Sequence, residues 1–430
     1  MEEDMKYALI HGILLDGSEH MEPVFNKIVL IEDEIIQDIV DENYNIAGYT
    51  CIDLQNKYLM PGLINLHVHL PSSGKPKKKE LDPKKTVKIM TSCSLLKKVV
   101  VRLCTDFAKM QLKSGVTTIR TVGGVQDVDT QIRDWIERNE IVGPRILAGN
   151  MAISVEGGHM AGSLAYAPQT PEQAKECAEK IVKENPDVIK LMITGGVLDA
   201  TVKGEPGVLK MPAAFVKSVC DVAHAHHLPV AAHVESSKGV QVALENGVDT
   251  IEHGAKPNEE ILRLFKEKKA AHIATLSPAL PFALFDRSAS HVSSMAQYNG
   301  KIVFDGIIEC AKACLEHDIP VGLGTDTGCP YITHYDMWRE LNYFHTYCGV
   351  SNQFALYTAT KRNAQIAHID HLTGTIEKGK CADLIVTKDN PLVSLEALRH
   401  VDLVFARGKI VSDLKIKKMK EVEEQLDRFL

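Results

Sequence analysis

Leu59-Met-Pro-Gly-Leu-Ile-Asn-Leu-His-Val-His-Leu70 is the stretch that decides the fold of this 430-residue chain. Its apolar run predicts a buried β-strand over Leu63–His69, and alternate side chains of a strand share one face. The imidazoles of His67 and His69 therefore point the same way, with Asn65 behind them. Neutral imidazole is a common ligand of divalent metals, so the pair predicts half of a metal site. A His-x-His pair alone also fits two polar residues at a strand end, and the rest of the chain must decide.

The chain after Gly62 alternates between short apolar runs and amphipathic helical stretches. The expected strands are Leu63–His69, Val116–Thr121, Arg145–Ala148, Val188–Thr194, Pro229–His233, Thr250–His253, Ala270–Thr275 and Val321–Thr325. The expected helices are Pro171–Glu184, Met211–His226, Lys238–Asn246, Asn258–Glu267 and Lys301–His317, then Tyr335–Cys348 and Asn352–His368. Eight alternating units predict an α/β fold with a TIM-like (β/α)8 barrel over residues 62–373.

Both ends of the chain have β texture. The expected strands before the barrel are Tyr7–Leu15, Lys27–Ile31, Ile35–Val40 and Thr50–Leu54. Those after it are Thr375–Lys378, Asp383–Thr387, Val401–Ala406 and Lys409–Val411. We expect one small β-sandwich domain made from residues 1–61 and 374–413, followed by a C-terminal helix over 414–430 that docks on its own domain.

Composition excludes several classes of protein. A net charge of −7 argues against general nucleic-acid binding, which needs clustered Lys and Arg over a whole face. The chain contains no run of about 18 uncharged apolar residues, so we expect no membrane span. The ten cysteines have no Cys-x-x-Cys spacing, and the acidic start lacks the apolar run of a secretory signal. We therefore expect a cytoplasmic protein with no membrane or nucleic-acid partner.

Substrate-covering lids are expected in the segments 71–98 and 276–300, because barrel specificity resides in the βα loops. Segment 71–98 is rich in lysine and is either a solvated basic loop or a lid whose positive charge steers anions toward the site. Seven of its lysines follow the His pair closely: Lys75, Lys77, Lys78, Lys79, Lys84, Lys85 and Lys88.

Further potential ligands follow other barrel strands. Barrel enzymes place their chemistry at the carboxyl ends of the strands. His233 ends the fifth expected strand, His253 ends the sixth and Asp326 follows the eighth. Each alone could meet solvent or cap the next helix. Together with His67 and His69 they converge on one rim, which predicts a metal site.

Lys190 stands in the middle of the apolar fourth strand, Val188–Thr194. Burying a charged ammonium is costly, so burial favours the neutral amine. A neutral amine can add carbon dioxide, and the resulting carbamate has two oxygens that suit bridging of two cations. A lysine that reaches solvent or pairs with a carboxylate is the alternative. Two cations can share a hydroxide and polarise a carbonyl, while Asp326 binds one metal and moves the proton from water to the leaving amine.

These motifs resemble the amidohydrolase superfamily over nearly the whole chain. The resemblance is carried by Pro61–His69, Ile189–Leu191, Ala232-His233, Asp249–Gly254, Gly324–Asp326 and Gly374–Ile385. Glu156-Gly-Gly-His159, Ile193-Thr-Gly-Gly196 and Ala364-Gln365 are most similar to the imidazolonepropionase-related branch, which contains prolidase-like Xaa-Pro dipeptidases and Xaa-Arg/Lys carboxypeptidases.

The resemblance implies a binuclear site with two divalent ions of the zinc type. His67 and His69 would hold one ion with Asp326, and His233 and His253 would hold the other. Carboxylated Lys190 and a hydroxide would bridge them. His159 would help to hold the substrate carbonyl or carboxylate.

The chain departs from the branch after its fifth barrel strand. Relatives often read His-Ala-His-Gly there, whereas this chain reads His233-Val-Glu235-Ser. Glu235 lies two residues after a ligand and so points to the same side. It is either a salt-bridged carboxylate of the rim or a group that contacts a cationic part of the substrate or moves protons.

The expected activity is metal-dependent hydrolysis of an amide bond in a dipeptide or N-acyl amino acid. The alternative enzyme is a cyclic amidohydrolase or deaminase acting on a nitrogen heterocycle. The resemblance disfavours it, because deaminases of the superfamily usually use one metal and lack the bridging lysine. A scaffold that kept the barrel should have lost ligands, and none is missing. We expect a small-molecule substrate. The sequence allows a homo-oligomer but does not decide the oligomeric state.

Overall fold

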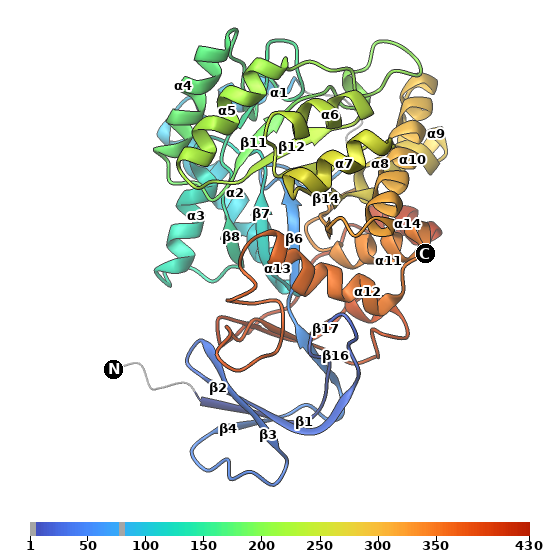
Figure 1. Cartoon of the computed structure of the whole chain (residues 1–430). Coiled ribbons are helices and arrows are strands. Elements are labelled where there is room, and N and C mark those ends of the chain that lie inside the picture. Colours follow the sequence, from blue (N-terminus) through green and yellow to red (C-terminus); the bar gives the residue numbers. More distant parts are fainter. Residues whose placement is uncertain (1–5, 77–81) are drawn as a thin grey trace.

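The computed structural model of the chain describes residues 6–76 and 82–430. It confirms all eight expected barrel strands (Figure 1). They are β6 (Leu63–Val68), β7 (Val116–Thr121), β8 (Arg145–Leu147), β11 (Ile189–Met192), β12 (Val230–Val234), β13 (Thr250–His253), β14 (Ala271–Ala274) and β15 (Val321–Leu323). Two further strands of two residues each, β9 (Ala152–Ile153) and β10 (Ala165–Tyr166), extend the sheet beside β11 and were not expected.

Parallel pairing joins β6–β7–β8 and β11–β12–β13–β14–β15. Backbone hydrogen bonds connect the two sets. The N–H of Asp326 donates to the carbonyl of His67 at 2.8 Å, and the N–H of Asp187 donates to the carbonyl of Ala148 at 2.7 Å. The first of these bonds brings the carboxyl ends of the first and last barrel strands together.

Helices surround these strands (Figure 1). They include α2 (Ser94–Lys113), α3 (Val128–Glu137), α4 (Pro171–Val182), α5 (Ala213–Ala225), α6 (Ser237–Glu245), α7 (Glu259–Lys268), α10 (Ser294–Glu316) and α11 (Met337–Cys348). Local sequence explains where several begin: the side chains of Thr170, Ser236, Asn258 and Ser293 each accept a hydrogen bond from a backbone N–H of the first turn. The helix expected over 352–368 is divided into α12 (Asn352–Tyr357), a π-helical turn (Thr358–Arg362) and α13 (Asn363–Ile366).

One of the two expected lid segments is largely helical. Segment 276–300 forms α8 (Leu276–Leu284), α9 (Arg287–Ser290) and the first turns of α10. The buried carboxylate of Glu340, on α11, accepts hydrogen bonds from the N–H groups of Leu276 and Ser277 at 2.6 and 2.8 Å. Tertiary contact therefore stabilises the start of α8, which local sequence does not reveal. In segment 71–98, α1 (Pro83–Met90) is solvated and buries no residue, while Lys77–Lys79 lie outside the described residues.

Strands from both chain ends form one sheet at the amino end of the barrel strands (Figure 1). Its order is β18-β17-β16-β5-β1-β2-β3, with β4 paired to β1. The strands are β1 (Lys6–Leu14), β2 (Val24–Glu32), β3 (Ile35–Asp41), β4 (Thr50–Asp53), β5 (Tyr58–Pro61), β16 (Leu384–Thr387), β17 (Val401–Ala406) and β18 (Lys409–Ile410). The carboxyl ends of the barrel strands therefore face away from this sheet.

Two expectations for the chain ends were wrong in detail. Thr375–Lys378 forms no strand, because Gly374 and Gly379 turn the backbone with positive φ on either side of it. The strand that joins the two chain ends is β5, which pairs with both β1 and β16. The C-terminal helix, expected over 414–430, is shorter: α14 spans Lys420–Leu426 and a 3-10 turn follows.

Ion pairs between buried Arg339 and both Glu423 (3.2 Å) and Asp427 (2.6 Å) hold α14 against α11. Among the described residues, the structure contains no helix that is both long and apolar enough to cross a membrane.

Candidate metal centre

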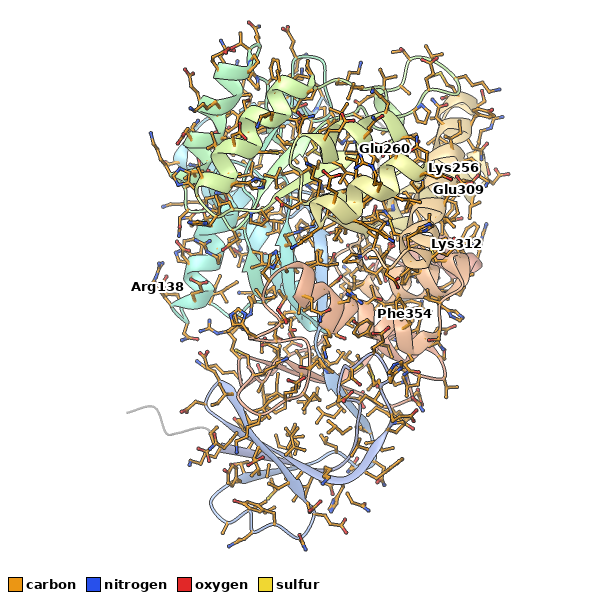
Figure 2. The ribbon with its side chains drawn as sticks, in the orientation of Figure 1. Arg138, Lys256, Glu260, Glu309, Lys312 and Phe354 are labelled. Carbon is orange, nitrogen blue, oxygen red and sulfur yellow. The ribbon has the colours of Figure 1, made fainter. Side chains whose placement is uncertain are left out.

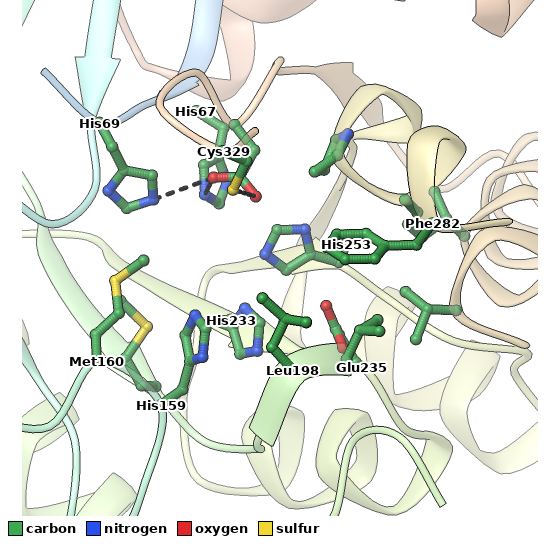
Figure 3. Close-up of a pocket in the computed structure, with 18 of the residues that line it drawn as sticks. His67, His69, His159, Met160, Leu198, His233, Glu235, His253, Phe282 and Cys329 are labelled. Carbon is green, nitrogen blue, oxygen red and sulfur yellow. Dashed lines mark hydrogen bonds and ion pairs between the residues drawn. The ribbon is translucent and has the colours of Figure 1, made fainter. Parts of the chain in front are cut away.

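All eight candidate residues line one cavity of about 110 Å³ at the carboxyl ends of the barrel strands (Figure 3). They are His67, His69, His159, Lys190, His233, Glu235, His253 and Asp326. Parallel strands end at the same rim of a barrel, so residues far apart in sequence meet there. The convergence expected from the strand ends is therefore present, and the roles of the residues depend on their geometry.

His67, His69 and Asp326 form one side of the cavity. Oδ1 of Asp326 lies 3.6 Å from Nε2 of His67 and 3.2 Å from Nε2 of His69. The Nδ1–H of His69 donates to the carbonyl of Gly123 at 2.8 Å, which leaves Nε2 with its lone pair toward the cavity. Asp326 has a φ of +55°, a strained conformation for a residue with a side chain.

A buried ion pair that sequence reasoning missed orients His67. The Nδ1–H of His67 donates to Oε2 of Glu252 at 2.7 Å. Oε1 of Glu252 accepts from Nη2 of Arg120 and from the hydroxyl of Thr250, both at 2.7 Å. The available signal was an acid and an arginine inside the apolar strands Thr250–His253 and Val116–Thr121. The pair fixes the tautomer that presents Nε2 of His67 to the cavity.

His233 and His253 form the other side. Their ring centroids are 4.6 Å apart, and the ring of His253 lies 4.9 Å from that of His67. Nδ1 of His253 is 2.7 Å from the hydroxyl of Thr275, and the backbone of His253 has a φ of +67°. His67, His253 and Asp326 each offer one ligand atom, and these three atoms lie within 4.8 Å of one another.

Lys190 is fully buried, and its Nζ has no hydrogen-bond partner among the described residues. Burial lowers the pKa of this lysine to about 8. The neutral amine is therefore far more accessible near neutral pH than in an exposed lysine. A buried amine without a partner is costly, so the geometry calls for a group that is absent from the polypeptide alone.

The electrostatics of the cavity suit cations. Burial is the main cause that lowers the pKa of His67 to about 4, and the nearby charge of Lys190 is the next. Burial also holds the pKa values of His233 and His253 well below the ordinary range. Although burial alone would raise it, His67 and His69 hold the pKa of Asp326 well below its usual value. Neutral imidazoles and an ionised carboxylate are metal-ligand forms, so this donor set fits divalent cations.

His159 lies over His233, with the two rings stacked at a centroid distance of 4.3 Å (Figure 3). Its Nδ1–H donates to Oδ2 of Asp199 at 2.5 Å. Asp199, the last residue of the 3-10 turn Val197–Asp199 after β11, was not expected, because its only sequence signal is an acid near a glycine pair. The contact leaves Nε2 of His159 as the lone-pair atom at the cavity.

Glu235 and an apolar wall complete the cavity. Oε2 of Glu235 is buried with no hydrogen-bond partner among the described residues, and burial with nearby Asp326 raises its pKa to about 8. Glu235 forms no salt bridge within the described part of the chain, so the structure does not show the salt-bridged rim carboxylate that was one of the two expectations for it. The wall consists of Val197, Leu198, Pro278, Ala279, Phe282, Val303 and Ile307.

Known proteins resemble this chain over almost its full length. Residues 58–411 match the model of the amidohydrolase family. A solved structure from Bifidobacterium longum, provisionally named a prolidase, is 32% identical with a TM-score of 0.87, covering 99% of this chain and 98% of that chain. Ochratoxinase from Aspergillus niger is 24% identical, over 95% of this chain and 87% of its own. A 5-methylthioadenosine/S-adenosylhomocysteine deaminase from Bacillus cytotoxicus is also 24% identical, over 96% of this chain and 93% of its own.

Proposed function

We propose a specific activity for this chain, which belongs to the amidohydrolase family and is therefore a hydrolase that acts on C–N bonds. We infer that it cleaves the amide bond of a dipeptide or N-acyl amino acid with the help of two divalent metal ions. The observation that carries this proposal is Lys190, a buried amine without a partner in the described structure. After burial, its charge is a further cause of the lowered pKa values of His67, His233 and His253, and this influence on both halves of the site supports a bridging role.

Each half of the donor set would hold one ion. His67, His69 and Asp326 would hold the first and His233 and His253 the second, with carboxylated Lys190 between them. Zinc suits these imidazole and carboxylate donors. When bound, such a pair supplies a water of lowered pKa and a Lewis acid for the substrate carbonyl.

The residues of the chain then have separate tasks. Asp326 has an ionised carboxylate at the ligand atoms of His67 and His69, so it can accept a proton from the attacking water and return it to the leaving amine. His159 would hold a substrate oxygen, and its hydrogen bond to Asp199 fixes the ring for that task. The Glu252–Arg120 pair keeps His67 in the ligand tautomer throughout.

The shape of the cavity indicates what the substrate carries. The wall around Phe282 would bury an apolar side chain. Glu235 faces the same space, and a substrate ammonium group would favour its charged form. A dipeptide with an apolar residue and a free amino group meets both conditions.

The test is a substrate screen of dipeptides, N-acyl amino acids and nitrogen heterocycles with zinc or manganese supplied. We expect amide cleavage by protein that holds two metal ions in this centre, and a changed substrate ranking for Glu235→Gln. Ammonia release from a heterocycle by protein with one ion in the centre would favour the deaminase alternative, which the Bacillus relative raises. An unchanged rate and ranking in Glu235→Gln would remove Glu235 from the substrate contacts.

A further inference from the structure

A second group of metal-ligand side chains lies between β14 and α10. It consists of His272, Cys310 and Cys314, and all three are fully buried. One ring nitrogen of His272 and the two sulfur atoms lie within 4.8 Å of one another. None of the three belongs to the described residues that line the cavity of the candidate metal centre. The group is therefore separate from that centre.

Helix α10 presents these thiols to the barrel. Cys310 and Cys314 are one turn apart and so share one face of the helix. The opposite face carries Glu309 and Lys312, which lie at the surface (Figure 2), and Glu309 pairs with Lys256 at 3.2 Å. Because the helix is amphipathic and packs against β14, the two sulfur atoms are held beside His272 by the fold itself.

His272 has the free lone pair that a metal ligand needs. Its Nε2 lies 2.7 Å from the carbonyl oxygen of His253, and because a carbonyl only accepts, Nε2 has the proton. Nδ1 is therefore unprotonated in the neutral ring. Among the described residues it has no hydrogen-bond partner, although it is buried. Buried polar atoms normally have partners, so an unpaired nitrogen on a ring that also contacts the Cys310 thiol points to a missing ligand.

We propose that His272, Cys310 and Cys314 bind one soft divalent cation, of which zinc is the natural example. Thiolate and imidazole are the donors that zinc prefers. Binding releases the two thiol protons to solvent, and two thiolates with a neutral imidazole balance a charge of +2. Charge balance matters in this dry part of the protein, where an uncompensated ion is costly.

The position of the site gives it a structural role for the cavity. His272 holds the carbonyl of His253, whose backbone is strained at a φ of +67°. A cation on His272 would fix the ring that holds this turn. The proposal concerns residues outside the candidate centre and does not depend on the activity proposed above.

The test compares the full-length protein with Cys310→Ala/Cys314→Ala after zinc loading in a reductant that does not bind metals. The matched control is Cys220→Ala, which removes another buried helical thiol. Zinc per chain is measured by mass spectrometry of the desalted protein. In a parallel series cobalt replaces zinc, because thiolate ligation produces a near-ultraviolet charge-transfer absorption that imidazole and carboxylate do not.

We expect the double variant to lose one zinc ion per chain and the whole cobalt–thiolate absorption, while Cys220→Ala keeps both. His67→Ala/His69→Ala should retain the absorption, which separates this site from the candidate centre. If the double variant does not fold, Cys314→Ala alone should reduce the absorption. Equal zinc content in the unmodified protein and the double variant, no thiolate absorption, or a Cys310–Cys314 disulfide in zinc-loaded protein would each overturn the proposal.

Discussion

Replacing Glu252 by Gln should weaken metal binding at His67 while changing no atom that faces the cavity. Oε1 of Glu252 accepts from two donors, Arg120 and Thr250, so the amide oxygen of Gln must take that place. The amide NH2 then faces Nδ1 of His67, which must accept and lose its proton. The ring is forced into the other tautomer, with the proton on Nε2 and no lone pair for a metal.

The magnitudes follow from the contacts. The hydrogen bonds from His67 and Thr250 change from charge-assisted bonds of about 1.5–3 kcal/mol each to neutral ones of about 0.5–1.5 kcal/mol, and the bond from Arg120 loses its ion pair. The free energy of unfolding of the metal-free protein should fall by about 3–4 kcal/mol, which is in the range for breaking a buried ion pair. Metal affinity should fall about 10–100-fold, as for loss of a carboxylate that orients a ligand histidine.

Two measurements check this prediction: competition with a chromophoric chelator for the metal dissociation constant, and urea unfolding of the metal-free protein. Thr250→Val is the matched control, because it removes one neutral partner shared by Glu252 and Arg120 and leaves the charge of Glu252 and the tautomer of His67 unchanged. The control should bind metal within about 2-fold of the unmodified protein and lose about 2 kcal/mol of stability, for two hydrogen bonds. Unchanged metal affinity in Glu252→Gln would refute the tautomer argument.

Three further predictions concern single residues. His67→Ala should remove the metal ion that Asp326 shares and abolish hydrolysis while the barrel stays folded, as measured by metal content, activity and circular dichroism; full activity with bound metal would contradict the whole assignment. Because burial lowers the pKa of Lys190 to about 8, metal-free protein reloaded in carbon-dioxide-free buffer should regain activity only after bicarbonate is added, and Lys190→Met should not respond; recovery without bicarbonate argues against a carbamate. Burial raises the pKa of Glu340 from 4.5 to about 7, so the folded state binds this proton more tightly than the unfolded state. Its contribution to stability is full below pH 4.5 and is lost as the pH rises through 7, a change of about 3 kcal/mol. Urea unfolding at pH 5 and pH 8 should show a difference of that size between the unmodified protein and Glu340→Gln, and equal pH dependence would disprove it.

The expected and observed barrels agree because the evidence for strands and helices is local. An apolar run of four to eight residues followed by a helical period is readable in any window of the chain. Strand order then places every carboxyl end on one rim, so His67, His69, Lys190, His233 and Asp326 could be assigned to one cavity before any coordinates were known. Their convergence needs no knowledge of side-chain contacts.

The partners of these residues could not be assigned in that way. Glu252 is 185 residues from His67 and Asp199 is 40 residues from His159, and no local period connects the members of either pair. Helix α8 begins where a loop was expected because Glu340, from a different helix, accepts its first N–H groups. β5 is a strand because it has β1 on one side and β16 on the other.

The sequence by itself therefore determined the barrel, its rim and the candidate ligands at the strand ends, since each depends on periodicity within a short window. Only the tertiary structure decided which tautomer His67 adopts, what holds His159, where the cavity wall comes from, and that His272 meets two thiols on α10. Those outcomes depend on hydrogen bonds and packing between distant segments, whose strength comes from burial that a sequence pattern does not encode.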